Sequence, residues 1–393
     1  MPEWSQRFAQ LGSKIDDQFD ALKGRLRRRT GSYQNLQVLP YRGFGNSEEF
    51  YLKGRVLRET RPAELEKANF WDNLMATYRR VHSVEVPNAV VRVTYGRIST
   101  DVLTDSEGYF ELHLANDGSG GVEPWRNIEV ELLSPKAEEK KSVTATVPAL
   151  VPPKTARFGI ISDIDDTIIV SNATNLLKVA YTTFTQNARS RVAFPGVAAF
   201  YRALQRGTNE REFNPVFYVS SGPWNLYDLL IDFMRLNEIP LGPILLQDYG
   251  VDETKVFSSS HRDHKMAQIR KLLETYPDLP FILIGDSGQH DPEIYRKVLE
   301  EVPARIKAIY IRNVTDETRA AEVRKLAKEA QEHGGELLLV KDSMEAAKHA
   351  VEKGYISAAS LPEIAGEKRK DEEEAVAIGT VQTEPPPIAP TDK

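Results

Sequence analysis

The chain has 393 residues, 41% hydrophobic and 27% charged, so it has a globular balance and enough length for two folded domains plus tails. Its formal net charge of −6 at pH 7 argues against a general nucleic-acid binder. It contains no cysteine, which excludes disulfides, thiolate metal sites and cysteine nucleophiles. No signal peptide and no run of about 18 apolar residues is visible, so we expect a soluble, cytoplasmic protein without a transmembrane segment.

Residues 1–40 are predicted to form an amphipathic helix followed by a linker. Apolar residues recur at steps of three and four from Trp4 to Leu26, and the end of the helix, residues 23–29, is basic. Such a stripe either packs against protein or rests on an anionic lipid surface. Peripheral membrane contact through this helix is therefore one of two open interpretations.

Residues 41–150 show a hydrophobic period of two, which predicts a β-sandwich. The candidate strands, separated by turn residues, are Phe50–Leu57, Val90–Thr94, Arg97–Thr104, Tyr109–Leu114, Ile128–Leu133 and Ser142–Val147. A helical insertion is expected over Ala63–Val81. Residues 86–114 resemble a transthyretin-like or carboxypeptidase-regulatory sandwich. No catalytic cluster is visible here, so we expect a binding or scaffolding module.

After a stiff, hinge-like linker at Pro148–Lys154, residues 155–356 alternate buried strands with helices, which predicts an α/β domain with a doubly wound parallel sheet. The expected strands are Phe158–Ser162, Val216–Ser220, Phe281–Gly285, Ala308–Ile311 and Glu336–Val340. The expected helices are Val197–Gln205, Trp224–Asn237, Asp263–Tyr276, Pro292–Glu301, Asp316–His333 and Ser343–Lys353. The short segment between the first two of these strands leaves room only for a minimal cap over the site, at Asn172–Arg191. The charged and proline-rich residues 361–393 are expected to be disordered.

The first catalytic candidate is a cluster of carboxylates at the end of a buried strand. Asp163, Asp165 and Asp166 follow Phe158–Ser162 directly. Carboxylates this close repel one another, and burying them is costly unless a cation compensates. Oxygen-only ligands suit a hard cation, Mg²⁺ in particular. A polar binding site for Mg²⁺ is therefore expected at the carboxyl end of this strand.

Three further segments place polar side chains at later strand ends and helix starts. Ser220, Ser221 and Gly222 follow the second strand, where hydroxyls and amides at a helix N-terminus would bind phosphate. Lys265 lies near the start of a helix, and the strand Phe281–Gly285 leads to Asp286 and Asp291. Because carboxyl ends of parallel strands share one edge of a sheet, these groups are expected to converge.

This order of motifs resembles the haloacid-dehalogenase superfamily of phosphohydrolases. The resemblance implies that Asp163 is the nucleophile that forms an aspartyl-phosphate, and that Asp165 is the general acid and base. It implies that Ser220 and Lys265 hold the phosphoryl oxygens. Asp286 would bind Mg²⁺ together with the Asp163 carboxylate and the Asp165 backbone carbonyl. Thr167 would orient the first loop, and Asp291 would support the lysine or the metal.

A closer resemblance is to the actin-patch phosphatidate phosphatase family. It rests on YRGFGNSEEFYLKGRVL, SDIDDTI, YVSSGPWNLY and LIGDSGQHDPEIY, and covers most of residues 41–312. The family implies hydrolysis of phosphatidate to diacylglycerol at a membrane surface. Asp166 stands where the related lipin-type loop DxDGT has glycine, so the lipin family is the poorer match.

Other functions remain open at this point. The residues themselves specify a phosphate ester and a metal, so a phosphoprotein or a soluble metabolite are alternative substrates. A non-catalytic module that recruits partners to a membrane is a second alternative. Gly285-Asp286-Ser287-Gly288 also occurs in serine hydrolases, although the alternating pattern contradicts a protease fold. No GxxxxGK[ST] motif is present, which excludes a P-loop enzyme. His290 either contacts substrate or caps a helix.

Overall fold

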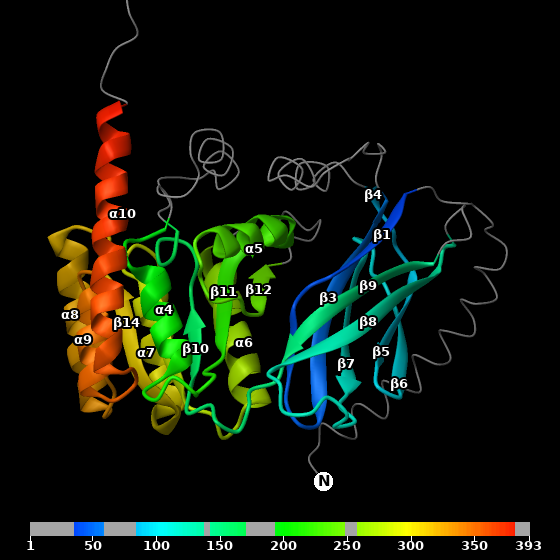
Figure 1. Cartoon of the computed structure of the whole chain (residues 1–393), viewed down its shortest axis with the longest axis horizontal. Helices are drawn as coiled ribbons and strands as arrows, with labels where there is room; N and C mark the ends of the chain where they lie inside the picture. Colours follow the sequence, from blue (N-terminus) through cyan, green and yellow to red (C-terminus); the bar gives the residue numbers. More distant parts are fainter. Residues whose placement is uncertain (1–34, 59–83, 137–141, 170–192, 248–257, 382–393) are drawn as a thin grey trace, which may run out of the picture.

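The computed structural model describes residues 35–58, 84–136, 142–169, 193–247 and 258–381. Figure 1 shows two sheets side by side, the C-terminal one covered by helices. Within these ranges no helix is long and apolar enough to cross a membrane. The predicted N-terminal helix, the helical insertion and the cap fall outside the described residues.

The N-terminal sheet contains nine strands, all paired antiparallel except β2 with β9. The strands are β1 Leu36–Pro40, β2 Gly43–Gly45, β3 Glu49–Arg58, β4 Val84–Glu85, β5 Val90–Tyr95, β6 Ile98–Leu103, β7 Tyr109–Ala115, β8 Trp125–Ser134 and β9 Val143–Leu150. Their order is β1-β3-β2-β9-β8-β5-β6, and β4 and β7 also pair with β3. All six predicted strands are confirmed. The sequence analysis missed β1, β2 and β4, and β1 occupies part of the expected linker.

The core of this sheet draws on strands from both ends of the pairing order. Phe50 of β3, Val93 of β5, Phe110 of β7 and Ile128 of β8 are all buried in one cluster. Along β7, buried and exposed residues alternate from Phe110 onward, because successive side chains of a strand point to opposite faces. One face of the sheet therefore closes around an apolar core.

The C-terminal sheet is entirely parallel and has the order β12-β11-β10-β13-β14-β15. Its strands are β10 Gly159–Ser162, β11 Val216–Pro223, β12 Ile244–Gln247, β13 Phe281–Asp286, β14 Ile306–Arg312 and β15 Leu337–Val340. The sequence analysis missed β12, a four-residue edge strand. The first strand of this sheet along the chain is β10. Strands β11 and β12 then lie on one side of it, and β13, β14 and β15 on the other. The strand order thus reverses at β10, where α/β sheets place their ligands.

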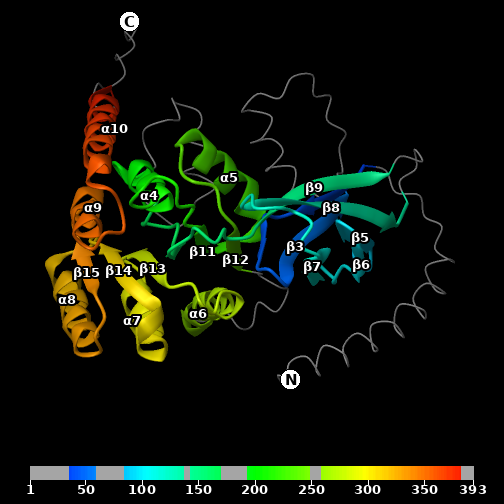
Figure 2. The same ribbon diagram turned by 60° about the horizontal axis from the view of Figure 1, so that its bottom comes forward.

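Helices cover both faces of the parallel sheet, as Figure 2 shows. The helices are α4 Val197–Arg206, α5 Tyr227–Leu236, α6 Ser258–Thr275, α7 Asp291–Glu301, α8 Glu317–Glu332, α9 Ser343–Glu352 and α10 Leu361–Val381. Helices α4, α5, α9 and α10 pack in the core cluster of one face, and α6, α7 and α8 in that of the other. The mixed α/β architecture predicted from the sequence is confirmed for this part of the chain.

The two sheets are in direct contact. Phe44 of β2 packs in the same core cluster as Phe217 and Tyr276, on the α6 side of the parallel sheet. The rings of Tyr41 and Trp224 stack with centroids 4.4 Å apart. Strand β9 also continues to Leu150, so the first half of the predicted linker is paired with β8 and β2. The expectation of a hinge beginning at residue 148 is therefore wrong.

The expected C-terminal disorder is also wrong for residues 361–381, which form α10. The carboxylate of Glu367 accepts hydrogen bonds from the Ala199 amide at 2.7 Å and from Arg202 at 2.5 Å. Asp371 accepts from the Gly196 amide at 2.9 Å, so α10 supplies caps for the N-terminus of α4. A highly charged sequence suggested disorder, but these charges have partners on α4 and at Asp342, the N-cap residue of α9.

Candidate active site

The first motif begins where β10 ends. The Asp163 amide donates to the Ile284 carbonyl at 2.9 Å, which extends the pairing of β10 with β13 by one residue. The following loop turns back at once, because the amides of Ile168 and Ile169 both donate to the Ile164 carbonyl. Ile164 and Ile168 are fully buried and anchor the loop. The Asp163 side chain therefore sits on a rigid support at the carboxyl edge of the sheet.

Asp166 occupies the tightest point of this loop. Its φ of 56° lies in the left-handed region, which costs an ordinary L-residue free energy but suits glycine, asparagine and aspartate. Its amide donates to the Ile169 carbonyl at 2.8 Å. This backbone conformation is one that both aspartate and glycine adopt.

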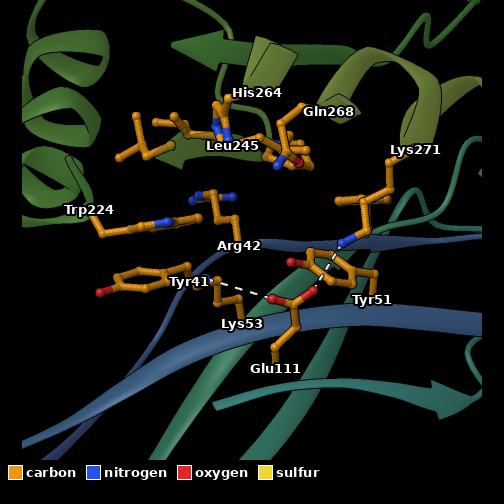
Figure 3. A pocket seen from close by; sticks show the side chains of 14 residues that line it. Tyr41, Arg42, Tyr51, Lys53, Glu111, Trp224, Leu245, His264, Gln268 and Lys271 are labelled. Carbon is orange, nitrogen blue, oxygen red and sulfur yellow. Dashed lines mark hydrogen bonds and ion pairs between the residues drawn. The ribbon is translucent and has the colours of Figure 1, made fainter. Parts of the chain in front are cut away.

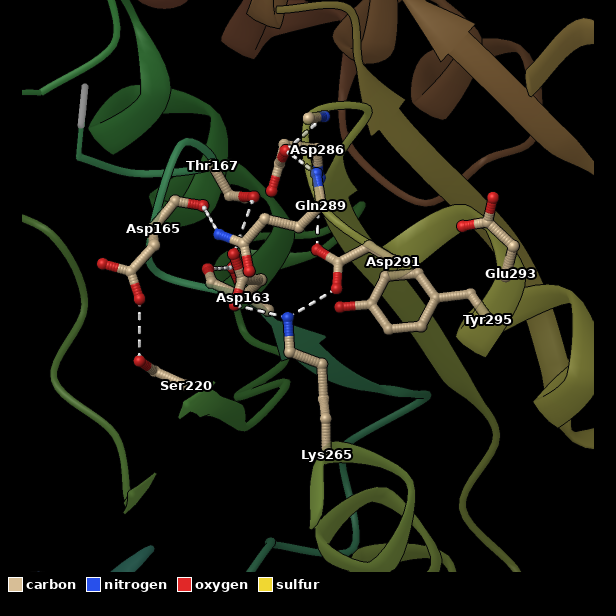
Figure 4. Close-up of polar contacts among 12 residues, drawn as sticks. Asp163, Asp165, Thr167, Ser220, Lys265, Asp286, Gln289, Asp291, Glu293 and Tyr295 are labelled. Atoms are coloured by element: carbon tan, nitrogen blue, oxygen red, sulfur yellow. Dashed lines mark hydrogen bonds and ion pairs between the residues drawn. The ribbon is translucent and has the colours of Figure 1, made fainter. Parts of the chain in front are cut away.

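Lys265 joins two of the carboxylates (Figure 4). Its Nζ atom donates to Asp163 Oδ1 at 2.8 Å and to Asp291 Oδ1 at 2.5 Å. All three side chains are at least 97% buried. Thr167 adds a weaker contact, with its Oγ1 3.4 Å from Asp163 Oδ2. The lysine thus holds the carboxylate at the end of β10 against the one at the start of α7.

Asp165 points toward the second motif. The Ser220 hydroxyl donates to Asp165 Oδ2 at 2.9 Å and accepts from the Gly222 amide at 2.9 Å. The strand β11 continues past Ser220 to Pro223, and a 3₁₀ turn over Trp224–Leu226 precedes α5. The predicted end of the strand at Ser220 is therefore wrong, because β11 runs three residues further with a register shift against β12, and the predicted helix from Trp224 begins as a 3₁₀ turn.

Asp286 closes the cluster from the end of β13. Its Oδ1 accepts from the amides of Gly288 and Gln289 at 2.6 and 3.0 Å. Its Oδ2 is buried and has no hydrogen-bond partner among the described residues. Carboxylate oxygens of Asp163, Asp286 and Asp291 lie within 4.8 Å of one another. A buried carboxylate oxygen without a donor is what a bound cation would satisfy.

Glycine is required just before this carboxylate. A Cβ on Gly285 would lie 2.4 Å from Asp291 Oδ2, closer than any side chain could tolerate. Asp291 Oδ2 also accepts from the Asp286 amide at 3.3 Å. The last motif therefore places two carboxylates side by side only because Gly285 leaves the space between them.

Burial and mutual repulsion dominate the electrostatics of the cluster. Burial raises the pKa of Asp163 well above its usual range, although Lys265 acts in the opposite direction. Burial, assisted by Asp291, raises the pKa of Asp286 to about 7. Burial also raises the pKa of Asp165, while the Ser220 hydrogen bond opposes it. The two carboxylates beside Lys265 raise its pKa despite burial, so the ammonium stays charged.

The sequence analysis gave most of these residues but missed their supports. Gln289 Nε2 lies 3.5 Å from the Asp165 carbonyl, and so links the first and last motifs. Arg319 of α8 braces the loop after β13, since it donates to the carbonyls of Ser287 and Gln289 at 3.0 and 2.9 Å. Gln289 could have been found from its place inside the last motif. No local signal in the sequence points to Arg319.

Ser287 is not placed to act as a nucleophile. It is fully buried, its hydroxyl lies 2.8 Å from Thr315 Oγ1, and it accepts from the Val314 amide at 3.0 Å. These bonds fasten β13 to the segment after β14. The serine-hydrolase interpretation therefore has no geometric support.

The side chain of His290 does not cap the helix that follows it. It is the N-cap residue of α7, but its side chain makes no capping hydrogen bond. Instead its Nδ1 lies 3.2 Å from Arg262 Nη2. Because arginine only donates, Nδ1 accepts, and the proton of a neutral imidazole is on Nε2. The capping alternative from the sequence analysis is therefore wrong.

The sequence is similar to that of known proteins over the residues that carry these motifs. Residues 158–313 match the family described as phosphatidate phosphatase APP1, catalytic domain. Phosphatidate phosphatase APP1 of Saccharomyces cerevisiae is 35% identical over 156 residues, which is 39% of this chain and 26% of the yeast protein. An uncharacterized protein of Schizosaccharomyces pombe, C29B5.04c, is 29% identical over 222 residues, 54% of this chain and 34% of that protein. The chain thus spans about a third of these relatives or less.

Likeness to solved structures is weak. A carbohydrate acetylesterase from Xanthomonas citri covers 73% of this chain and 72% of its own with 13% identity, at a TM-score of 0.25. A likeness at this level supports no conclusion about fold or function.

Proposed function

We propose that the chain is a Mg²⁺-dependent phosphomonoesterase that works through an aspartyl-phosphate, because residues 158–313 match the catalytic-domain family of phosphatidate phosphatase APP1. The observation that carries the proposal is the carboxylate cluster at the carboxyl edge of the parallel sheet. It contains Asp163, Asp286 and Asp291, with Lys265 as the cation bonded to it. A cluster with this excess of buried negative charge needs a further cation.

We assign the parallel sheet to the haloacid-dehalogenase type and the N-terminal sheet to a β-sandwich. The reversal of strand order at β10 and the placement of motifs on β10, β11 and β13 support the first assignment. The shared core of β3, β5, β7 and β8 supports the second. The domain limits 41–150 and 155–356 stay predictions.

Mg²⁺ would be held by the carboxylates of Asp163 and Asp286 and by the backbone carbonyl of Asp165. The partnerless Oδ2 of Asp286 supports this choice, and so does the Gln289 contact that brings the Asp165 carbonyl to the same loop. When bound, the ion supplies positive charge to the phosphoryl oxygens and keeps the carboxylates ionised. Asp291 is assigned to holding Lys265, because its Oδ1 accepts from the lysine at 2.5 Å and its Oδ2 from the Asp286 amide at 3.3 Å, whereas Asp163 Oδ2 has, within the described ranges, only the 3.4 Å contact with Thr167.

The residues then divide the reaction between them. A carboxylate oxygen of Asp163 attacks phosphorus, and the bond from phosphorus to the leaving oxygen breaks. Asp165, whose raised pKa favours the protonated form, gives its proton to that oxygen. Asp165 then takes a proton from water, which attacks phosphorus and releases phosphate and the free Asp163. The Lys265 ammonium and the Ser220 hydroxyl stabilise the charge on the phosphoryl oxygens. Ser221 and Gly222 would complete the phosphate site, and Thr167 and Asp291 would position Asp163 and Lys265.

Phosphatidate is the substrate we propose, and the product would be diacylglycerol. The name of the yeast relative supports this substrate. Access to a lipid requires contact with a membrane surface, for which the predicted N-terminal helix is a candidate. A phosphoprotein or soluble metabolite remains the alternative substrate, and a membrane-recruiting binding module the non-catalytic alternative.

The test measures phosphate release from phosphatidate in mixed micelles and from a soluble aryl phosphate, with Mg²⁺ or with EDTA. We expect release from both with Mg²⁺ and none with EDTA or in Asp163→Asn. Asp166→Asn is the matched control, since asparagine also adopts the left-handed conformation, and it should retain turnover. Turnover of the aryl phosphate alone would contradict the lipid substrate. No turnover of either would favour the binding module.

A further inference from the structure

A cavity of about 70 Å³ lies where the two sheets meet (Figure 3), lined on one side by the edge strand β12. Tyr41, Lys53 and Glu111 line it from the N-terminal sheet. Trp224 and Lys271 line it from the α/β part. None of these residues has a role in the reaction proposed above. We call this space the junction cavity.

The junction cavity carries an excess of positive charge. Its lining includes three cations, Arg42, Lys53 and Lys271, and among the described lining residues Glu111 is the single carboxylate. Glu111 is shared, since its carboxylate lies 3.0 Å from Lys271 Nζ and 3.7 Å from Lys53 Nζ. The Lys53 side chain is only 7% exposed. Burial, together with the charge of Lys53, lowers the pKa of Lys271 although Glu111 opposes this.

Arg42 is the cation without a carboxylate among the described residues. Its guanidinium lies 5.0 Å from the centre of the Trp125 ring, and its backbone amide donates to the Tyr227 hydroxyl. Burial lowers the pKa of Arg42, and nearby Arg235 adds to the effect. Arg42 is half-buried, and an anion in the cavity would offset the cost of desolvating its guanidinium without a counter-ion.

A neutral donor is available beside these cations. The Nε1 atom of Trp224 is buried and has no hydrogen-bond partner in the described part of the chain. The ring is held in place, because it stacks on Tyr41 at 4.4 Å and lies 5.2 Å from Lys53 Nζ. The unsatisfied indole N–H is a second observation, independent of charge, that points to a ligand with acceptor atoms.

We propose that the junction cavity binds the phosphate group of a small organic molecule or of a lipid headgroup. The Arg42 guanidinium and the Trp224 N–H would donate hydrogen bonds to phosphate oxygens, and the charges of Lys53 and Lys271 would attract the anion. Phosphate suits the site because its several acceptor oxygens can meet several converging donors. The rings of Tyr41 and Tyr51 would contact the rest of the ligand.

This site is separate from the carboxylate cluster but lies on the same supports. Trp224 follows Ser220 by four residues, and Lys271 is on α6, which carries Lys265. A phosphate in the junction cavity would therefore lie against α6 and against the 3₁₀ turn that directly follows β11. The proposal does not depend on the reaction, and binding alone tests it.

The experiment is a calorimetric titration of the full chain with inorganic phosphate in EDTA. Arg42→Gln should weaken binding about tenfold or more through loss of charge-assisted hydrogen bonds, and Trp224→Phe by a few-fold. Arg211→Gln, at an exposed arginine outside the cavity, should bind like the wild type. Ser220→Ala should keep the binding that Arg42→Gln removes. The proposal is overturned if Arg42→Gln binds like the wild type, or if Ser220→Ala removes all binding.

Unfolding of a variant is separated from loss of the site by the thermal midpoint, and Trp224→Phe retains the ring stack. Two further arms identify the source of the phosphate. Glycerol 3-phosphate tests a soluble ligand by the same titration. Sedimentation with phosphatidylcholine vesicles, with and without phosphatidylglycerol, tests a lipid headgroup. Whichever arm binds must lose binding in Arg42→Gln, and failure of both arms together with phosphate overturns the proposal.

Discussion

The carboxylate cluster and the junction cavity are built from opposite charges. The first brings the carboxylates of Asp163, Asp286 and Asp291 together with one lysine, and the second is lined by three cations, two of which are paired with Glu111. In the first, Lys265 bonds to two of the carboxylates, and in the second, the Glu111 carboxylate pairs with two of the lysines. The difference is in burial, because Lys265 is 3% exposed whereas the Glu111 side chain is 47% exposed. We expect the first cluster to need a cation strictly and the second to gain from an anion.

The largest effect should follow from removal of the buried lysine. Lys265→Met leaves the carboxylates without their bonded cation, and loss of one partner of a buried pair costs about 3–5 kcal/mol. The free energy of unfolding in urea measures this, and phosphate release should also disappear. Lys271→Met is the matched control in the junction cavity and should cost about 1 kcal/mol or less, because Glu111 remains half exposed. Equal losses in the two variants would break the comparison.

Magnesium should stabilise the protein more at high pH than at low pH. The pKa of Asp286 is raised to about 7 in the folded chain, above its usual value of 3.8. Its contribution to stability is therefore present at low pH, where it is protonated, and is lost as the pH rises through 7. Mg²⁺ restores stability where the carboxylate is charged. The increase in Tm with Mg²⁺ should be larger at pH 8 than at pH 6.

The pH dependence has its own control. Asp286→Asn removes the titrating group and one ligand together, so the difference between the two pH values should shrink or vanish. An equal rise in Tm at pH 6 and pH 8 in the wild type would mean that Mg²⁺ does not compete with a proton on this carboxylate.

A smaller effect on stability is expected at Ser287, the residue next to Asp286 of the carboxylate cluster. Ser287→Ala removes a hydroxyl that bonds Thr315 and the Val314 amide, which should cost about 1 kcal/mol of stability. Turnover of the aryl phosphate should stay within a few-fold of the wild type, as initial rates would establish. Complete loss of turnover in a folded variant would revive a serine nucleophile.

The smallest effect concerns the carboxylate of the junction cavity. Glu111→Gln removes a half-exposed partner of two lysines, so the free energy of unfolding should fall by about 1 kcal/mol or less. Phosphate should bind more tightly, because the cavity loses its negative charge. A calorimetric titration compares the two Kd values. Weaker phosphate binding in Glu111→Gln would argue that Glu111 orders the site rather than opposing the ligand.

Much of the candidate site could be predicted because its motifs are local. Asp163 follows the buried strand β10 directly and Asp286 is the last residue of β13, and parallel strands bring such ends to one edge. Other features had no local signal. Strand β12 is four residues long at the sheet edge, and the charges of α10 indicated disorder until their partners on α4 were visible.

The sequence by itself determined the α/β sheet, the order of the motifs along it and the residues of the carboxylate cluster. Hydrophobic runs and adjacent polar residues are short-range properties, and strand pairing turns them into a site without further information. Three features depend on the tertiary structure alone: the Asp286 oxygen without a partner among the described residues, the hydrogen bond from Arg319 to the loop after β13, and the junction cavity. Glu111 and Lys271 are 160 residues apart and meet only because the two sheets pack together. Their charges and burial depend on that packing, which no local pattern encodes.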